Sequence, residues 1–97
     1  MVREALQIDQ KDNVGIALRP LKAGTLVSVN RRGGDEIRVS LLDDIPFGHK
    51  FALRRIQAGE HVIKYGETIG MATQHIERGQ HVHTHNVASL RGRGDKR

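Results

Sequence analysis

Short runs of β-branched residues, each separated from the next by a turn signal, limit most strongly what this chain can fold into. They occupy residues 13–18, 25–30, 36–42, 61–64 and 81–87. No stretch of ten or more residues keeps a 3.6-residue apolar period, so any helix is limited to a single turn. The pattern predicts an all-β domain of short strands. A hairpin is expected at residues 31–35, where Gly33 and Gly34 supply the positive φ that tight turns need.

A seven-residue pattern occurs twice, twenty positions apart. Ile-Gln-Ala-Gly-Glu-His-Val at 56–62 returns as Ile-Glu-Arg-Gly-Gln-His-Val at 76–82, and Leu-Lys-Ala-Gly-Thr at 21–25 is a weaker third copy. Each copy has an apolar anchor, two polar residues and a glycine that reverses the chain, which predicts a repeated turn leading into a strand. The repeat gives His61 and His81 equivalent places. For His61, a half-exposed strand position is the favoured interpretation.

Composition restricts the class of protein further. The 97 residues are enough for one small domain, and 37% hydrophobic content with three aromatic residues gives it a lean core. The absence of cysteine excludes disulfides and cysteine-ligated metal sites within this chain, so any metal must bind histidine, carboxylate or carbonyl groups. No apolar run approaches the roughly 20 residues of a membrane span, and no signal-peptide core follows the N-terminus. We therefore expect a cytoplasmic protein with no membrane association.

The net charge of +5 raises the question of nucleic-acid binding. Much of the excess lies in the last seven residues, whose composition favours a solvated, disordered basic tail. Base stacking would also need aromatic side chains, and only Phe47, Phe51 and Tyr65 are present. We therefore predict a folded domain over residues 1–90, a disordered tail over 91–97, and no nucleic-acid partner.

Three of the six histidines alternate near the C-terminus, at His81, His83 and His85. On a strand they would share one face, since successive side chains point to opposite sides. Neutral imidazole is a common metal ligand and a proton-transfer group near neutral pH. Strand positions two apart are about 7 Å apart and positions four apart about 13 Å, so a single ion would need ligands from elsewhere in the chain. The alternative is a polar strand face that points into solvent.

A second concentration of polar residues follows Pro46 and Gly48, which present His49 and Lys50 from a defined loop. Functional residues concentrate on loops held by a rigid scaffold. His49 is then a candidate metal ligand or base, and Lys50 a cation that pairs with a substrate carboxylate. The equally weighted alternative is a turn-capping histidine beside a solvated lysine.

Two further segments carry weaker signals. Gly66 and Gly70 bracket polar groups that could bind an anion through backbone N–H groups, but a β-turn and a strand kink are the favoured interpretation. Asp43 and Asp44 precede the Pro46 loop and are expected to serve as turn-forming acceptors rather than as catalytic acids.

Segments 12–18, 44–53, 63–70 and 79–87 together resemble the N-terminal domain of altronate and galactarate dehydratases, in both order and spacing. The resemblance extends over nearly the whole chain up to Val87. It implies a β-clip fold of the SAF type, a small and mostly antiparallel β domain, in agreement with the strand pattern. It also implies an enzyme that removes water from a sugar acid to give a 2-keto-3-deoxy acid, with the help of iron(II), manganese or another divalent metal.

The resemblance implies a set of functional residues. His49, Lys50 and His85 are the predicted catalytic residues, and His83 and His85 the predicted metal ligands. Lys50, Lys64 and Asn86 are the predicted substrate-binding residues. We expect His49, His83 and His85 to converge on one point, with Lys50 at its rim.

The chain stops after Arg97 without a large domain, so we expect it to act as a small subunit beside a large catalytic dehydratase subunit. An alternative is the small subunit of a sulfolactate sulfo-lyase, which eliminates sulfite instead of water. An alternative of another class is a non-catalytic SAF module for ligand binding or assembly, which would not need His83 and His85. In isolation the chain is expected to form homo-oligomers, since the partner surface would otherwise expose apolar area.

Overall fold

Short strands in two sheets make up the computed structural model, which describes residues 3–90. They are β1 (Ala5–Gln7), β2 (Val14–Ala17), β3 (Leu26–Arg31), β4 (Glu36–Ser40), β5 (Lys50–Ala52), β6 (His61–Lys64), β7 (Glu67–Ala72), β8 (His81–Val82) and β9 (Val87–Ser89). The described residues form no helix, so the prediction of an all-β fold is confirmed. None of them therefore belongs to a helix long and apolar enough to cross a membrane. The predicted tail over 91–97 lies outside the described residues.

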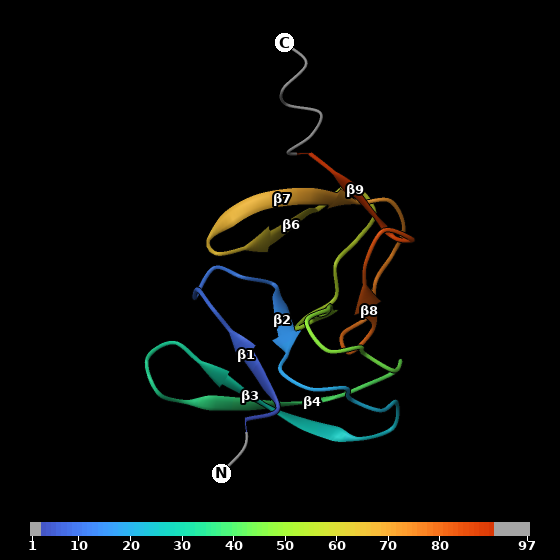
Figure 1. Cartoon of the computed structure of the whole chain (residues 1–97). Helices are drawn as coiled ribbons and strands as arrows, with labels where there is room; N and C mark the ends of the chain where they lie inside the picture. The colour runs from blue at the N-terminus through green and yellow to red at the C-terminus, as the bar shows by residue number, and fades with distance from the viewer. Residues whose placement is uncertain (1–2, 91–97) are drawn as a thin grey trace.

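The larger sheet has six strands in the order β4-β3-β1-β2-β5-β8, and the smaller sheet has the order β6-β7-β9. Strands β1 and β3 run parallel, and every other pair of the described strands is antiparallel. Figure 1 shows the hairpin β6–β7 with β9 at one end of the molecule and β3 with β4 at the other. Strands β5 and β8 lie side by side between these ends.

Three of the predicted runs contain the strands β2, β4 and β6, and a fourth covers β3 except for its last residue, Arg31. The hairpin at residues 31–35 joins β3 to β4 with Asn30 opposite Glu36. The fifth prediction, one strand over 81–87, is wrong. Strand β8 ends at Val82, the chain turns over 83–86, and β9 begins at Val87 in the other sheet. Strands β1 and β5 were not predicted, because glycine and charged residues interrupt or flank their short apolar patterns. The turn and strand favoured at Gly66 and Gly70 correspond to the turn after β6 and to β7.

The repeated turn is confirmed, and the structure adds a fourth copy at residues 45–48. In each copy the apolar anchor forms an isolated bridge to the anchor of another copy: Leu21 pairs with Ile45, and Ile56 pairs with Ile76. The glycine of each turn has a φ between +81° and +92°, a conformation that costs other residues about 1–2 kcal/mol. Two pairs of turns therefore brace the fold, one pair in each half of the chain.

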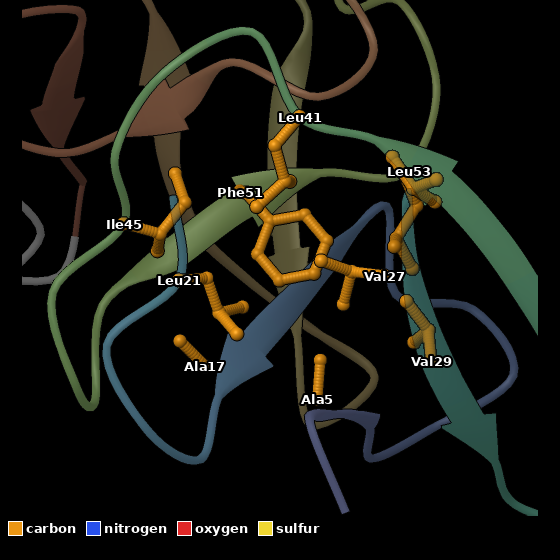
Figure 2. Close-up of a cluster of buried hydrophobic side chains, with 10 residues drawn as sticks. Ala5, Ala17, Leu21, Val27, Val29, Leu41, Ile45, Phe51 and Leu53 are labelled. Atoms are coloured by element: carbon orange, nitrogen blue, oxygen red, sulfur yellow. The ribbon is translucent and has the colours of Figure 1, made fainter. Parts of the chain in front are cut away.

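Two clusters of buried side chains form the core. The first surrounds Phe51, which is fully buried among residues of β1, β2, β3 and the first pair of turns (Figure 2). The second contains Ile56, Ile76 and Val82 with neighbouring aliphatic side chains. Strand β5 contributes to both, because Phe51 and its successor Ala52 point to opposite faces. Burial of Phe51 alone contributes about 1.5–3 kcal/mol, so β5 is a firm support for the residues beside it.

Candidate functional site

Two of the repeated turns deliver histidines to one place. His49 directly follows the turn at 45–48, and His81 lies two residues beyond Gly79 of the turn at 76–79. Strands β5 and β8 pair antiparallel, with Lys50 opposite Val82. Continuing that register by one residue sets His49 opposite His83, so the pairing of β5 with β8 assembles the histidines.

The imidazoles of His49, His81 and His83 form a compact group, which we call the histidine cluster. Nδ1 of His49 lies 2.9 Å from Nε2 of His81, within hydrogen-bonding distance. The rings of His49 and His83 stack with their centroids 4.3 Å apart. One ring nitrogen from each of the three residues lies within 4.8 Å of the others. The ring of His85 is tilted against that of His81 at 5.4 Å, and this side chain is exposed at the outside of the cluster.

Asn86 explains why the strand ends at Val82. Its side-chain oxygen accepts a hydrogen bond from the backbone N–H of His83 at 3.0 Å, and its amide donates to the carbonyl of His81 at 2.8 Å. These side-chain bonds close a turn at the outer edge of β8, and the backbone bond from Asn86 N–H to the His83 carbonyl completes it at 3.1 Å. On the same side of β8, a carboxylate oxygen of Asp43 accepts from the N–H of His81 at 2.9 Å.

Burial and mutual repulsion act on two imidazoles of the cluster. Desolvation, and then the nearby His49, lower the pKa of His81 below its ordinary value. Desolvation, His49 and the ammonium of Lys50 lower the pKa of His83 in the same way. Both rings are therefore predominantly neutral at pH 7, the state in which imidazole accepts a proton or binds a metal.

A pocket of about 320 Å³ adjoins the cluster, and His83 lines it. Lys50 and Lys64 line the same pocket, together with Tyr65 and Ser89. Lys50 lies opposite Val82 in the pairing of β5 with β8, and Val82 lines the same pocket. Burial, and then repulsion from Lys64, lower the pKa of Lys50. Two cationic side chains thus face one pocket, an arrangement that attracts an anionic ligand.

The structure brings together some of the predicted site residues and separates others. His49 and His83 meet in the cluster, and Lys50 and Lys64 meet in the pocket. His85 does not belong to the group of close donor atoms, whose third member is His81. Asn86 is only 2% exposed, and its amide is used within the turn. Its predicted contact with a substrate therefore stays a prediction, whereas its observed contacts hold the turn.

Sequence reasoning left His81 out of the predicted site, although the twenty-residue repeat had already placed it at the end of a turn. What was missing was the pairing of β5 with β8, which joins segments thirty residues apart. Tyr65 and Ser89 were also missed, since no local pattern links them to Lys50.

The donor set of the cluster fits a divalent transition metal. Nitrogen ligands about 2.1 Å from one ion lie roughly 3–3.5 Å apart. The His49 and His81 nitrogens lie 2.9 Å apart in a hydrogen bond, and the donor atoms of all three residues lie within 4.8 Å of one another. Imidazole ligands suit iron, zinc, nickel and copper ions. Three such ligands leave further coordination positions for water or substrate.

The fold and the site define a small all-β domain that presents a histidine cluster beside a lysine-lined pocket. The chain belongs to the altronate/galactarate dehydratase SAF domain family, which matches residues 3–90.

Individual relatives agree with this assignment. The chain is 48% identical to altronate dehydratase of Escherichia coli over 82 residues, which are 84% of this chain and 16% of that protein. It is 36% identical to altronate dehydratase of Bacillus subtilis over 86 residues, again 16% of that protein. It is 38% identical to (2R)-sulfolactate sulfo-lyase subunit alpha of Chromohalobacter salexigens over 85 residues, 86% of this chain and 90% of that subunit. The chain thus spans about a sixth of the dehydratases and most of the sulfo-lyase subunit.

Proposed function

We propose that this chain is the SAF domain of a sugar-acid dehydratase of the altronate or galactarate type, acting with a large catalytic subunit. The reaction would eliminate water from an aldonic or aldaric acid and give a 2-keto-3-deoxy acid. One observation carries the proposal: the cluster of His49, His81 and His83 adjoins a pocket with two lysines. The 48% identity to altronate dehydratase over 84% of the chain supports the choice of substrate class.

The proposed chemistry uses both parts of the site. Lys50 and Lys64 bind the substrate carboxylate through their ammonium groups. A neutral imidazole accepts the proton from the carbon next to that carboxylate, and a protonated group donates a proton to the hydroxyl on the adjacent carbon, which leaves as water. The resulting enol tautomerises to the 2-keto acid. The exposed His85, which lies outside the group of close donor atoms, is the proposed proton-transfer residue, and the lowered pKa values of His81 and His83 keep those two imidazoles in the neutral form that can bind a metal.

A divalent metal, iron(II) or manganese, is part of the proposal. His49, His81 and His83 would hold it, with His85 adjacent. When bound, such an ion would stabilise the negative charge that develops on the substrate carboxylate. The large subunit would supply the remaining ligands.

The second candidate is a sulfolactate sulfo-lyase, in which sulfite rather than water leaves the substrate. The match over 90% of the Chromohalobacter salexigens alpha subunit favours it. Both reactions begin with removal of a proton next to a carboxylate, so the same residues would serve either one.

The test is to co-express the chain with the large subunit encoded nearest to it and to assay the purified complex with ferrous or manganous ion. Altronate, galactarate and sulfolactate are offered in turn. Release of a 2-keto acid supports the dehydratase, and release of sulfite supports the sulfo-lyase instead. A stable complex with no turnover would favour a non-catalytic module and contradict both proposals.

Two variants sharpen the test. His83→Ala, which alters the cluster, is expected to abolish turnover while the complex still forms. His75→Ala is the matched control, because His75 is exposed, lies outside the cluster and is paired with Glu77. It is expected to leave turnover unchanged. Full turnover in the His83→Ala complex would contradict the catalytic role of the cluster.

A further inference from the structure

Asn13 makes the same two side-chain hydrogen bonds to the backbone of residues 61–63 as Asn86 makes to that of residues 81–83. Its side-chain oxygen accepts from the N–H of Ile63 at 2.8 Å, and its amide donates to the carbonyl of His61 at 2.9 Å. Both asparagines are 2% exposed. The two segments lie twenty positions apart, at the ends of the two close copies of the repeated turn. The same side-chain device therefore occurs twice, at equivalent places in the fold.

This pair of bonds fixes a defined piece of backbone. An asparagine amide has one acceptor and two donor positions, so it can bond the carbonyl of one residue and the N–H of the residue two further on. The two bonded residues are then held at a constant spacing with their side chains on one side of the chain. At 61–63 these residues are His61 and Ile63. At 81–83 they are His81 and His83, both members of the histidine cluster.

The bonds matter most at His83, because β8 has ended one residue earlier. The pairing of β5 with β8 stops at Lys50 and Val82, so no strand bond fixes the backbone of His83. Its N–H, at the outer edge of β8, is bonded to the side chain of Asn86. The ring of His83 nevertheless stacks on that of His49 at 4.3 Å.

We propose that Asn86 is a positioning residue for the histidine cluster. It holds the backbone of His81 and His83 through its two side-chain hydrogen bonds, so that both imidazoles face His49. Asn13 makes the same bonds to residues 61–63, which contribute no imidazole to the histidine cluster. Its bonds therefore contribute to the stability of the fold but do not position the cluster. The proposal concerns the free chain and does not depend on the proposed function or on a metal.

The test compares Asn86→Asp with Asn13→Asp in the full chain. An aspartate keeps the acceptor for the backbone N–H but loses the donor, and it sets a carboxylate oxygen against a carbonyl oxygen. Both variants are therefore expected to lose similar thermal stability. Nuclear Overhauser contacts between the rings of His49 and His83 are recorded with a chelator present, at one alkaline pH at which the imidazoles are neutral. We expect these contacts in the wild type and in Asn13→Asp, and their loss in Asn86→Asp.

Retention of the ring contacts in folded Asn86→Asp would overturn the proposal, and so would equal loss in both variants. If Asn86→Asp does not give a dispersed amide spectrum, Asn86→Ser is used, whose hydroxyl can still accept a hydrogen bond from the N–H of His83. The same loss of ring contacts is expected there, and their survival would again overturn the proposal. Because no substrate, metal or partner is involved, failure here is distinguishable from failure of the proposed enzyme.

Discussion

Replacing Gly79 by alanine tests how the repeated turn supports the histidine cluster. Gly79 has a φ of +92°, and a Cβ atom there would lie 2.2 Å from the carbonyl oxygen of Ser40 and 3.4 Å from Cα of Leu41. Gly59 occupies the same place in the other close copy, with a φ of +90° and no atom within 4 Å of its Cβ position. The two substitutions therefore share the cost of the backbone conformation and differ in the space available.

The shared cost is about 1–2 kcal/mol, since in a left-handed conformation the Cβ of alanine lies too close to the following carbonyl oxygen. Gly79→Ala adds the displacement of a neighbouring backbone segment, and overpacking of this kind costs typically 1–3 kcal/mol. We therefore expect a loss of about 1–2 kcal/mol for Gly59→Ala and about 2–5 kcal/mol for Gly79→Ala. The displacement also strains the bond of 2.9 Å from the N–H of Leu42 to the carbonyl of Gly79.

Equilibrium unfolding in urea measures both free energies, and the difference between the two variants isolates the close approach to Ser40. The imidazole signals of His81, two residues beyond Gly79, should shift in Gly79→Ala and stay in place in Gly59→Ala. Equal destabilisation by both substitutions would refute the reasoning, because it would mean that the backbone around Gly79 yields without cost.

Three further outcomes are expected. The pKa of His81 is lower in the folded chain than its ordinary value, so below a pH of about 6.5 the unfolded chain binds more protons than the folded chain and stability falls. The urea concentration at the unfolding midpoint, measured with a chelator present, should therefore decrease as the pH is lowered from about 7.5 to about 5. The decrease should be smaller in His81→Gln. Replacement of His49 by alanine should weaken cobalt(II) binding by at least about tenfold, since even residues that only orient ligands contribute that much, whereas calorimetry should find His75→Ala unchanged. Phe51→Ala should cost about 3–5 kcal/mol in urea unfolding, whereas Phe47→Ala, at a side chain 68% exposed, should cost little.

Local patterns were sufficient to predict much of the fold. The alternation of apolar residues located four strands, and the two glycines at 33 and 34 located a hairpin. The repeated turns were also visible, although the copy at 45–48 was hidden because proline and phenylalanine replace its polar residues. Strand β5 was missed for a related reason: Gly48 and His49 precede it, and only three residues belong to it.

The candidate site was predicted only in part, because its assembly depends on contacts between distant segments. Proximity of His49 to His83 was expected and is observed, but the place of His81 follows from the β5–β8 pairing, which no local pattern encodes. The break in the run at 81–87 depends on the side chain of Asn86 bonding backward along the chain. Strand propensity alone cannot anticipate a turn that is held by a side chain.

Side chains that bond the outer backbone of β8 also determine how other molecules can approach the cluster. Strand β8 ends its sheet and β6 ends the other, and such edges ordinarily offer unpaired N–H and C=O groups to a strand from another molecule. Asp43 and Asn86 already occupy these groups beside the cluster, as Asn13 does along β6. A second copy of the chain could extend these edges only by displacing buried amides. A molecule that contacts the imidazoles is therefore expected to do so through its side chains or as a small molecule, and not by adding a strand to β8.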